Sequence, residues 1–190
     1  MCINKHHHKP IVAALLLGVW FSTSVCAQSL SKPEQLDLLF EQLLEVELDE
    51  AELIERKILA EWNKSGSAAM DLLFRRGEYA MEAGTPDVAL QHFTALIDHA
   101  PNFAAGYNGR ASAYYQLGLY GPAFDDLRQV LVFEKRHFEA MKGVAVMLEE
   151  IGQQQDALEV WHQVHALLPT DPEVSAMIAR LEIRLEGETI

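Results

Sequence analysis

The sequence predicts an all-α fold in which helix–turn–helix units repeat along the chain. Ala, Leu and Glu, which are strong helix formers, make up 62 of residues 28–190. The alternation of apolar and polar residues that is typical of β-strands is scarce. Residue types also recur at a fixed interval of 34 positions between about Met70 and Pro169, and such a period predicts a solenoid of stacked units.

Residues 1–27 have the order of features found in secretory signal peptides. Lys5 and Lys9 precede the apolar run IVAALLLGVWF, and small residues follow as far as Ala27. The run is short for a membrane span, which needs about 20 residues. We therefore predict a periplasmic or secreted protein with cleavage after Ala27, so that no membrane contact remains. The alternative is a membrane-anchored envelope assembly factor that is held by an uncleaved N-terminal segment.

The charge of the chain is strongly negative, with 28 acidic and 15 basic side chains and a formal net charge of −13. Cleavage would remove Lys5 and Lys9 but no acidic residue, which changes the charge to −15. Nucleic acid is disfavoured as a partner, because binding it requires many cations against the phosphates. Both cysteines, Cys2 and Cys26, lie in the predicted signal peptide, so the mature chain would depend on apolar packing rather than on disulfides.

Six positions hold their residue type in phase through the repeat. In the second helix of each unit, a small residue is followed four positions later by a large apolar one. In the first helix, a small residue lies between two larger residues, and the spacing of the three is the same in every unit. Small residues let paired helices approach closely, and large ones fill the space between them. The sets are Ala89, Ala123 and Ala157; Phe93, Leu127 and Trp161; Leu73, Tyr107 and Met141; Gly77, Ala111 and Ala145; Ala80, Tyr114 and Leu148; and Pro101 and Pro169, with Lys135 in the middle unit.

This arrangement resembles the tetratricopeptide repeat, a 34-residue helix–turn–helix unit. The resemblance covers residues 70–171 and implies three repeats, at 70–103, 104–137 and 138–171. Gly84, Gly118 and Gly152 fall where each unit turns between its helices. One departure is an arginine, Arg76 or Arg110, in place of the usual Leu before the small residue. A partly buried arginine needs a partner, and Asp125 and Asp126 are the candidates for Arg110.

Two further helical segments flank the repeats. Residues 30–66 are expected to form an acidic helical hairpin that packs as a degenerate extra unit, with Pro33 opening its first helix and Asp49 capping its second. Between residues 31 and 64 this hairpin has ten acidic and four basic side chains. Residues 172–187 are expected to form a capping helix, with Asp171 as its N-cap and Pro172 in its first turn. Such a helix closes the open end of a solenoid.

The sequence contains no motif for catalysis, for a nucleotide or for a metal centre. The five histidines that would survive cleavage are spread along helix faces, without a cysteine or a dense ligand cluster beside them. No pair of carboxylates is singled out for acid–base work. We therefore expect a protein that is not an enzyme and uses no cofactor. An enzyme built on a helical-repeat frame is the second alternative.

The resemblance also implies where a partner binds. In the tetratricopeptide family the first helix of each repeat lines a concave groove that holds a peptide or a partner helix. We therefore expect a protein–protein interaction scaffold whose ligand is a protein or peptide segment. A clamp for a C-terminal carboxylate is disfavoured, because Phe74 offers no hydrogen-bond donor and Glu78 would repel the carboxylate. The groove positions are Phe74, Asn108 and Lys142 in one row, Glu78, Ser112 and Val146 in the next, and Met81, Tyr115 and Glu149 in the third.

Among these positions Tyr115 is the strongest candidate anchor, since aromatic side chains dominate the energetics of such contacts. Two other possibilities remain open on the sequence alone. In the first, the groove positions are ordinary solvent-exposed helix surface and bind no partner. In the second, the acidic hairpin binds a basic partner and the groove does not.

Overall fold

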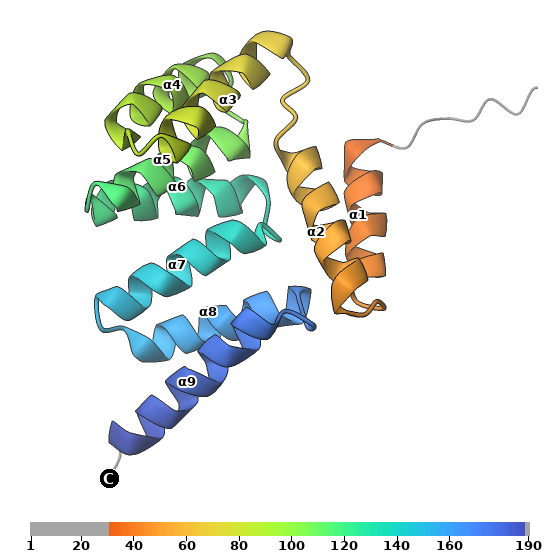
Figure 1. Cartoon of the computed structure of the whole chain (residues 1–190), viewed down its shortest axis with the longest axis vertical. Coiled ribbons are helices and arrows are strands. Elements are labelled where there is room, and N and C mark those ends of the chain that lie inside the picture. Colours follow the sequence, from red (N-terminus) through yellow and green to blue (C-terminus); the bar gives the residue numbers. More distant parts are fainter. Residues whose placement is uncertain (1–30, 189–190) are drawn as a thin grey trace, which may run out of the picture.

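The computed structural model describes residues 31–188, and this part of the chain consists of helices joined by short turns (Figure 1). The predicted signal peptide lies outside the described residues. The helices are α1 (Lys32–Leu43), α2 (Leu48–Trp62), α3 (Ala68–Glu82), α4 (Pro86–His99), α5 (Ala104–Gln116), α6 (Tyr120–Phe133), α7 (Phe138–Glu150), α8 (Gln154–Leu167) and α9 (Pro172–Glu188). The all-α solenoid that the period predicted is therefore the observed architecture.

Each 34-residue interval contains one helix pair, and the three pairs turn in the same way. Gly84, Gly118 and Gly152 have φ values of +69°, +71° and +82°, a conformation that strains any residue with a side chain. In each turn the amide that follows the glycine donates to a carbonyl five residues earlier, as from Thr85 to Ala80. This hydrogen bond ends the first helix in the manner of a Schellman motif.

The small and large positions of the repeat meet in the core. Phe93 is 1% exposed, and its ring lies against Gly77 of its own pair and Gly109 of the next. A Cβ added at either glycine would come within 2.6 Å of that ring, so both positions must remain glycine for α3, α4 and α5 to pack as they do. Ala89, Ala123 and Ala157 are fully buried.

The arginines that replace leucine have different environments. Arg110 donates from Nε and an Nη to the two carboxylate oxygens of Asp126, at 2.7 and 2.8 Å. Asp126 is buried, so the pair lies inside the repeat as the sequence analysis expected, whereas Asp125 pairs with Arg128 on the surface. Arg76 is exposed, so it is not one of the partly buried arginines that need a partner.

The acidic hairpin does not stack in front of α3 as an extra unit. Its buried side chains, which include Phe40 and Trp62, belong to the same core cluster as residues of α7, α8 and α9. The Trp62 ring stacks on His137 with a 4.2 Å centroid separation, and the Phe40 ring meets Phe138 edge to face. The chain can return in this way because residues 63–67 form a non-helical link with Gly66 at a φ of +81°.

Helix α9 covers the last repeat. Its Val174 and Leu181 are fully buried, in the cluster that also contains Trp161. The predicted cap is present, since Asp171 Oδ1 accepts from the amides of Glu173 and Val174 at 2.8 and 3.2 Å. The cap predicted for the second helix is wrong, because α2 begins at Leu48 and Asp49 lies inside its first turn.

Candidate functional site

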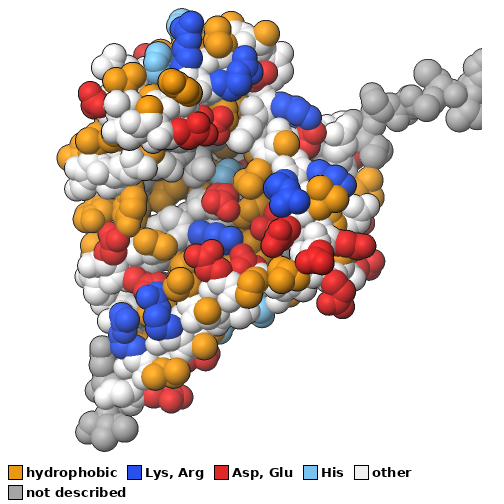
Figure 2. Space-filling model, viewed as in Figure 1, with side chains coloured by type: hydrophobic (Ala, Val, Ile, Leu, Met, Phe, Trp, Pro, Cys, Tyr) orange, Lys and Arg blue, Asp and Glu red, His pale blue; other side chains and the backbone are white. Residues whose placement is uncertain are grey.

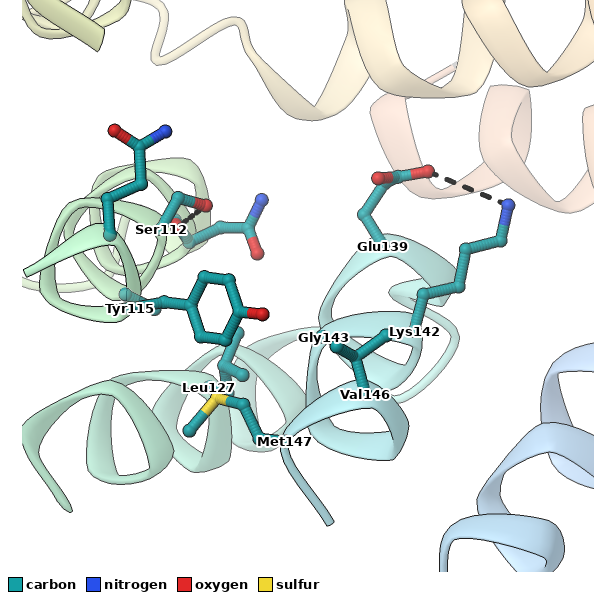
Figure 3. A pocket seen from close by; sticks show the side chains of 11 residues that line it. Ser112, Tyr115, Leu127, Glu139, Lys142, Gly143, Val146 and Met147 are labelled. Carbon is teal, nitrogen blue, oxygen red and sulfur yellow. Dashed lines mark hydrogen bonds and ion pairs between the residues drawn. The ribbon is translucent and has the colours of Figure 1, made fainter. Parts of the chain in front are cut away.

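The first helices of the three pairs face a groove that contains two adjoining cavities. The first, which we call the apolar cavity, has a volume of about 340 Å³ and lies between α5 and α7 (Figure 3). The second, which we call the acidic cavity, has a similar volume and is bounded by α2, α3, α5 and the start of α7. Asn108, Ser112 and Glu139 line both cavities, so the two are neighbouring parts of one groove.

The floor of the apolar cavity is built from core and near-core residues. Leu127 and Met147 are buried beneath it, and Val146 is 36% exposed at its side. Gly143 keeps this part of α7 close to α6, because a Cβ there would come within 3.2 Å of Leu127. The result is an apolar depression that is open to solvent on one side, a common form of ligand site.

Tyr115 projects from α5 across the apolar cavity toward α7 (Figure 3). Its hydroxyl donates to a carboxylate oxygen of Glu150 at 2.5 Å. This hydrogen bond to a carboxylate raises the pKa of Tyr115 to about 12, so the side chain stays neutral. The ring also packs against Tyr120, with centroids 5.7 Å apart. Tyr115 is therefore held in a fixed orientation with its ring available to a ligand.

Lys142 is the cation among the residues that line the two cavities, and it already has a partner. Its Nζ donates to Asp171 at 2.9 Å and lies 3.9 Å from Glu139. Burial by itself would lower the pKa of Lys142, but the hydrogen bond to Asp171 and the nearby carboxylates raise it overall. Lys142 thus holds the start of α9 against α7 and is not free to bind a carboxylate.

Two carboxylates of the acidic cavity, Glu78 and Glu82, have no such partner. Neither Glu78 nor Glu82 makes a hydrogen bond or an ion pair within the described part of the chain. Burial, together with the charge of Glu82, raises the pKa of Glu78 despite an opposing effect of Arg75. In Figure 2 acidic side chains border the hollow in the middle of the visible face.

The predicted groove residues fall into two groups. Seven of them line one or both cavities and are accessible, namely Glu78, Met81, Asn108, Ser112, Tyr115, Lys142 and Val146. Phe74 borders the acidic cavity but is only 6% exposed and packs on Phe93 and Phe103, so it is mainly a core residue. Glu149 lines neither cavity, because it accepts from Trp161 Nε1 and pairs with Arg180.

Several lining residues were missed. Glu139 and Gly143 lie one helical turn apart on α7. Glu139 precedes Lys142, a member of the first predicted row, by about one turn. Extending each row by one turn toward the helix start would have found Glu139. Leu59 of α2 and Asn63, which follows the end of that helix, also border the acidic cavity, and no periodic signal connects them to it. The groove and the hairpin, which the sequence presented as competing sites, therefore share a wall.

Neither a metal site nor a membrane span is present among the described residues. Between residues 31 and 188 no three His, Cys, Asp or Glu side chains are grouped so that they could hold a metal ion. None of the helices there has the length and apolar character that a bilayer span requires.

Comparison with known proteins identifies the family. The chain is 34% identical over 160 residues to a TPR repeat-containing protein of Rhizobium etli, which covers 84% of this chain and 78% of that protein. The protein belongs to the tetratricopeptide-repeat family. No family model matches the chain.

Solved structures of tetratricopeptide-repeat domains share the fold. The first TPR of Spaghetti (RPAP3), bound to an HSP90 peptide, superposes with a TM-score of 0.59 at 20% identity and covers 62% of this chain and 93% of that one. The type III secretion translocator chaperone SycD of Yersinia enterocolitica also gives a TM-score of 0.59, at 18% identity, over 65% of this chain and 99% of that one.

Proposed function

We propose that this tetratricopeptide-repeat protein is a non-enzymatic interaction scaffold that binds a segment of a partner protein in the groove of α3, α5 and α7. The observation that carries the proposal is the apolar cavity with Tyr115 fixed across it. A rigid aromatic anchor beside an apolar depression is the kind of surface that supplies most of the binding energy in protein interfaces. The RPAP3 domain that shares this fold was solved with an HSP90 peptide, which supports the use of the groove for a peptide.

We propose further that the protein acts in the periplasm or outside the cell. The support is the order of a basic start, a short apolar run and small residues in residues 1–27. Mass spectrometry of the protein isolated from its host should then find Gln28 as the first residue. A full-length product in the membrane fraction would favour the anchored alternative instead.

The binding proposal is tested with a displayed library of random 12-residue peptides selected on the immobilised protein. Peptides selected on the wild type are synthesised, and their affinities are measured by fluorescence polarisation. Replacing Tyr115 and Asn108 together by Ala should weaken binding at least tenfold, because it removes the aromatic anchor and a polar contact from the cavity wall. Circular dichroism should show unchanged helicity and only a small fall in melting temperature, from the lost contacts of Tyr115 with Glu150 and Tyr120.

Matched controls separate the groove from the rest of the surface. Tyr79→Ala changes a tyrosine that is 74% exposed and lines neither cavity, so it should leave the affinities unchanged. The double charge reversal Glu41→Lys with Glu45→Lys tests the hairpin as a rival site. If the hairpin variant no longer binds the peptides, while the variant with Ala at positions 115 and 108 still does, the groove is not the binding site.

A further inference from the structure

We propose that the groove selects a partner segment in which an apolar side chain is followed or preceded within a few residues by Lys or Arg. This inference rests on the proposed function and specifies its ligand. The apolar side chain would occupy the apolar cavity, and the cation would enter the acidic cavity between Glu78, Glu82 and Glu139.

The first argument is continuity between the two cavities. Asn108 and Ser112, one turn apart on α5, border both of them, and Glu139 does the same from α7. A peptide that crosses this boundary would therefore place one side chain in the apolar cavity, over Leu127 and Val146. Another of its side chains would lie in the acidic cavity, near the carboxylates. Asn108 can meet the peptide backbone at the boundary, since its side-chain amide has both donors and an acceptor.

The second argument is charge complementarity. Three carboxylates, those of Glu78, Glu82 and Glu139, line the acidic cavity, and no Lys or Arg lines it. Lys142 lies next to Glu139 at 3.9 Å but forms its shorter contact, at 2.9 Å, with Asp171. Arg75 opposes the charge of Glu78 from outside the cavity. An incoming Lys or Arg would thus meet a net negative charge, and an incoming carboxylate would be repelled.

The third argument concerns the hairpin wall of the groove. Glu55 of α2 lies near enough to Lys142, Asp171 and Glu139 to interact with all three, and burial raises its pKa. The α2 helix therefore brings a further carboxylate close to Glu139, and Lys142 offsets part of its charge. A cation from a partner would reduce the repulsion among these carboxylates. A positively charged ligand should therefore bind more tightly than a negatively charged one.

The test uses a pool of eight-residue peptides with a fixed Leu at the fourth position and random residues elsewhere. The peptides are acetylated and amidated so that their ends carry no charge. The immobilised full chain is incubated with the pool at pH 7 in 50 mM NaCl, and retained peptides are identified by mass spectrometry. We expect Lys and Arg to be enriched, and Asp and Glu depleted, at positions next to the leucine.

Variants then assign the preference to the acidic cavity. Glu78→Gln with Glu82→Gln should weaken binding of the selected basic peptides about tenfold and reduce its sensitivity to added NaCl. The control, Glu50→Gln with Glu159→Gln, makes the same change in net charge at exposed positions outside both cavities and should have little effect. The reversed pair, Glu78→Lys with Glu82→Lys, should select acidic peptides instead.

The possible failures are distinguishable. Val146→Lys blocks the apolar cavity, and Val132→Lys, at a site 64% exposed on α6, is its matched control. Peptides that depend on Val146 but show no enrichment of Lys or Arg would leave the proposed function standing and overturn this inference. Retention that is the same in wild type and Val146→Lys would overturn both. A dimer in sedimentation that Val146→Lys dissociates would make a second copy the occupant and also overturn the inference.

Discussion

At the scale of single residues, the ion pair of Arg110 and Asp126 shows how one repeat tolerates buried charge. The guanidinium makes a two-point contact with the carboxylate, and their side chains are only 19% and 8% exposed. The third repeat has Val144 and Val160 at the positions 34 residues later. These two positions of the repeat therefore accept either an ion pair or apolar residues.

This equivalence predicts the outcome of a double-mutant cycle. Arg110→Val alone should lower the free energy of unfolding by about 3 kcal/mol, because Asp126 is left buried without its partner. Arg110→Val with Asp126→Val should recover most of that loss and lie within about 1 kcal/mol of the wild type. Urea unfolding followed by circular dichroism measures these two variants and the second single variant, Asp126→Val. A double variant as unstable as the sum of its two single variants would show that the pair is not coupled.

At the scale of elements, α9 has one packed face and one exposed face. Leu181 is fully buried in the cluster of the last repeat, whereas Ile183, two residues further, is 72% exposed. The start of the helix is fixed by Asp171, which caps it and pairs with Lys142 of α7. Burial alone would raise the pKa of Asp171, but the hydrogen bonds from Lys142 and the Val174 amide lower it overall.

The capping role of α9 leads to a matched comparison of two substitutions. Leu181→Ala should destabilise the protein by about 2–5 kcal/mol, because it opens a cavity against α8. Ile183→Ala removes a similar side chain from solvent-exposed surface and should cost less than about 0.5 kcal/mol. Differential scanning calorimetry of the two variants provides the test. Equal melting temperatures would mean that α9 does not close the solenoid.

At the scale of the whole molecule, the hairpin folds back over the far repeats and makes their packing depend on His137. This histidine is 2% exposed, stacks on Trp62 and accepts the Ala140 amide at Nδ1, thereby capping α7. Burial lowers its pKa to about 4, although a backbone hydrogen bond opposes the shift. Glu139 and Asn63 lie around the same cavity wall.

The lowered pKa makes the contribution of His137 to stability depend on pH. In the unfolded chain the imidazole binds a proton at about pH 6.5, whereas in the folded chain it stays neutral down to about pH 4. Its contribution is therefore complete above pH 6.5 and declines as the pH falls toward 4, by roughly 3 kcal/mol in total. Compared with wild type, His137→Asn, which keeps a neutral cap, should lose less stability over this range in urea titrations at fixed pH. Parallel curves for the two proteins would contradict the assignment.

The repeat architecture was determined by the sequence alone. The period of 34 located the three helix pairs, and the glycines at 84, 118 and 152 predicted the turns that their positive φ values now show. The Asp171 cap was predicted as well, and Asp126 was one of the two candidates for the partner of Arg110. These features lie within one helix or between helices that are adjacent in the sequence. Their contacts therefore follow from the constant spacing of the repeat.

The position of the hairpin was decided only by the tertiary structure. It is attached through residues 63–67, which are not helical. Its contacts join Phe40 to Phe138 and Trp62 to His137, residues that lie far apart in the sequence. No repeat spacing relates residues that far apart, and apolar surface on α1 and α2 is compatible with several docking sites. That long-range packing places α2 beside the groove, and so the second wall of the candidate site exists only in the folded molecule.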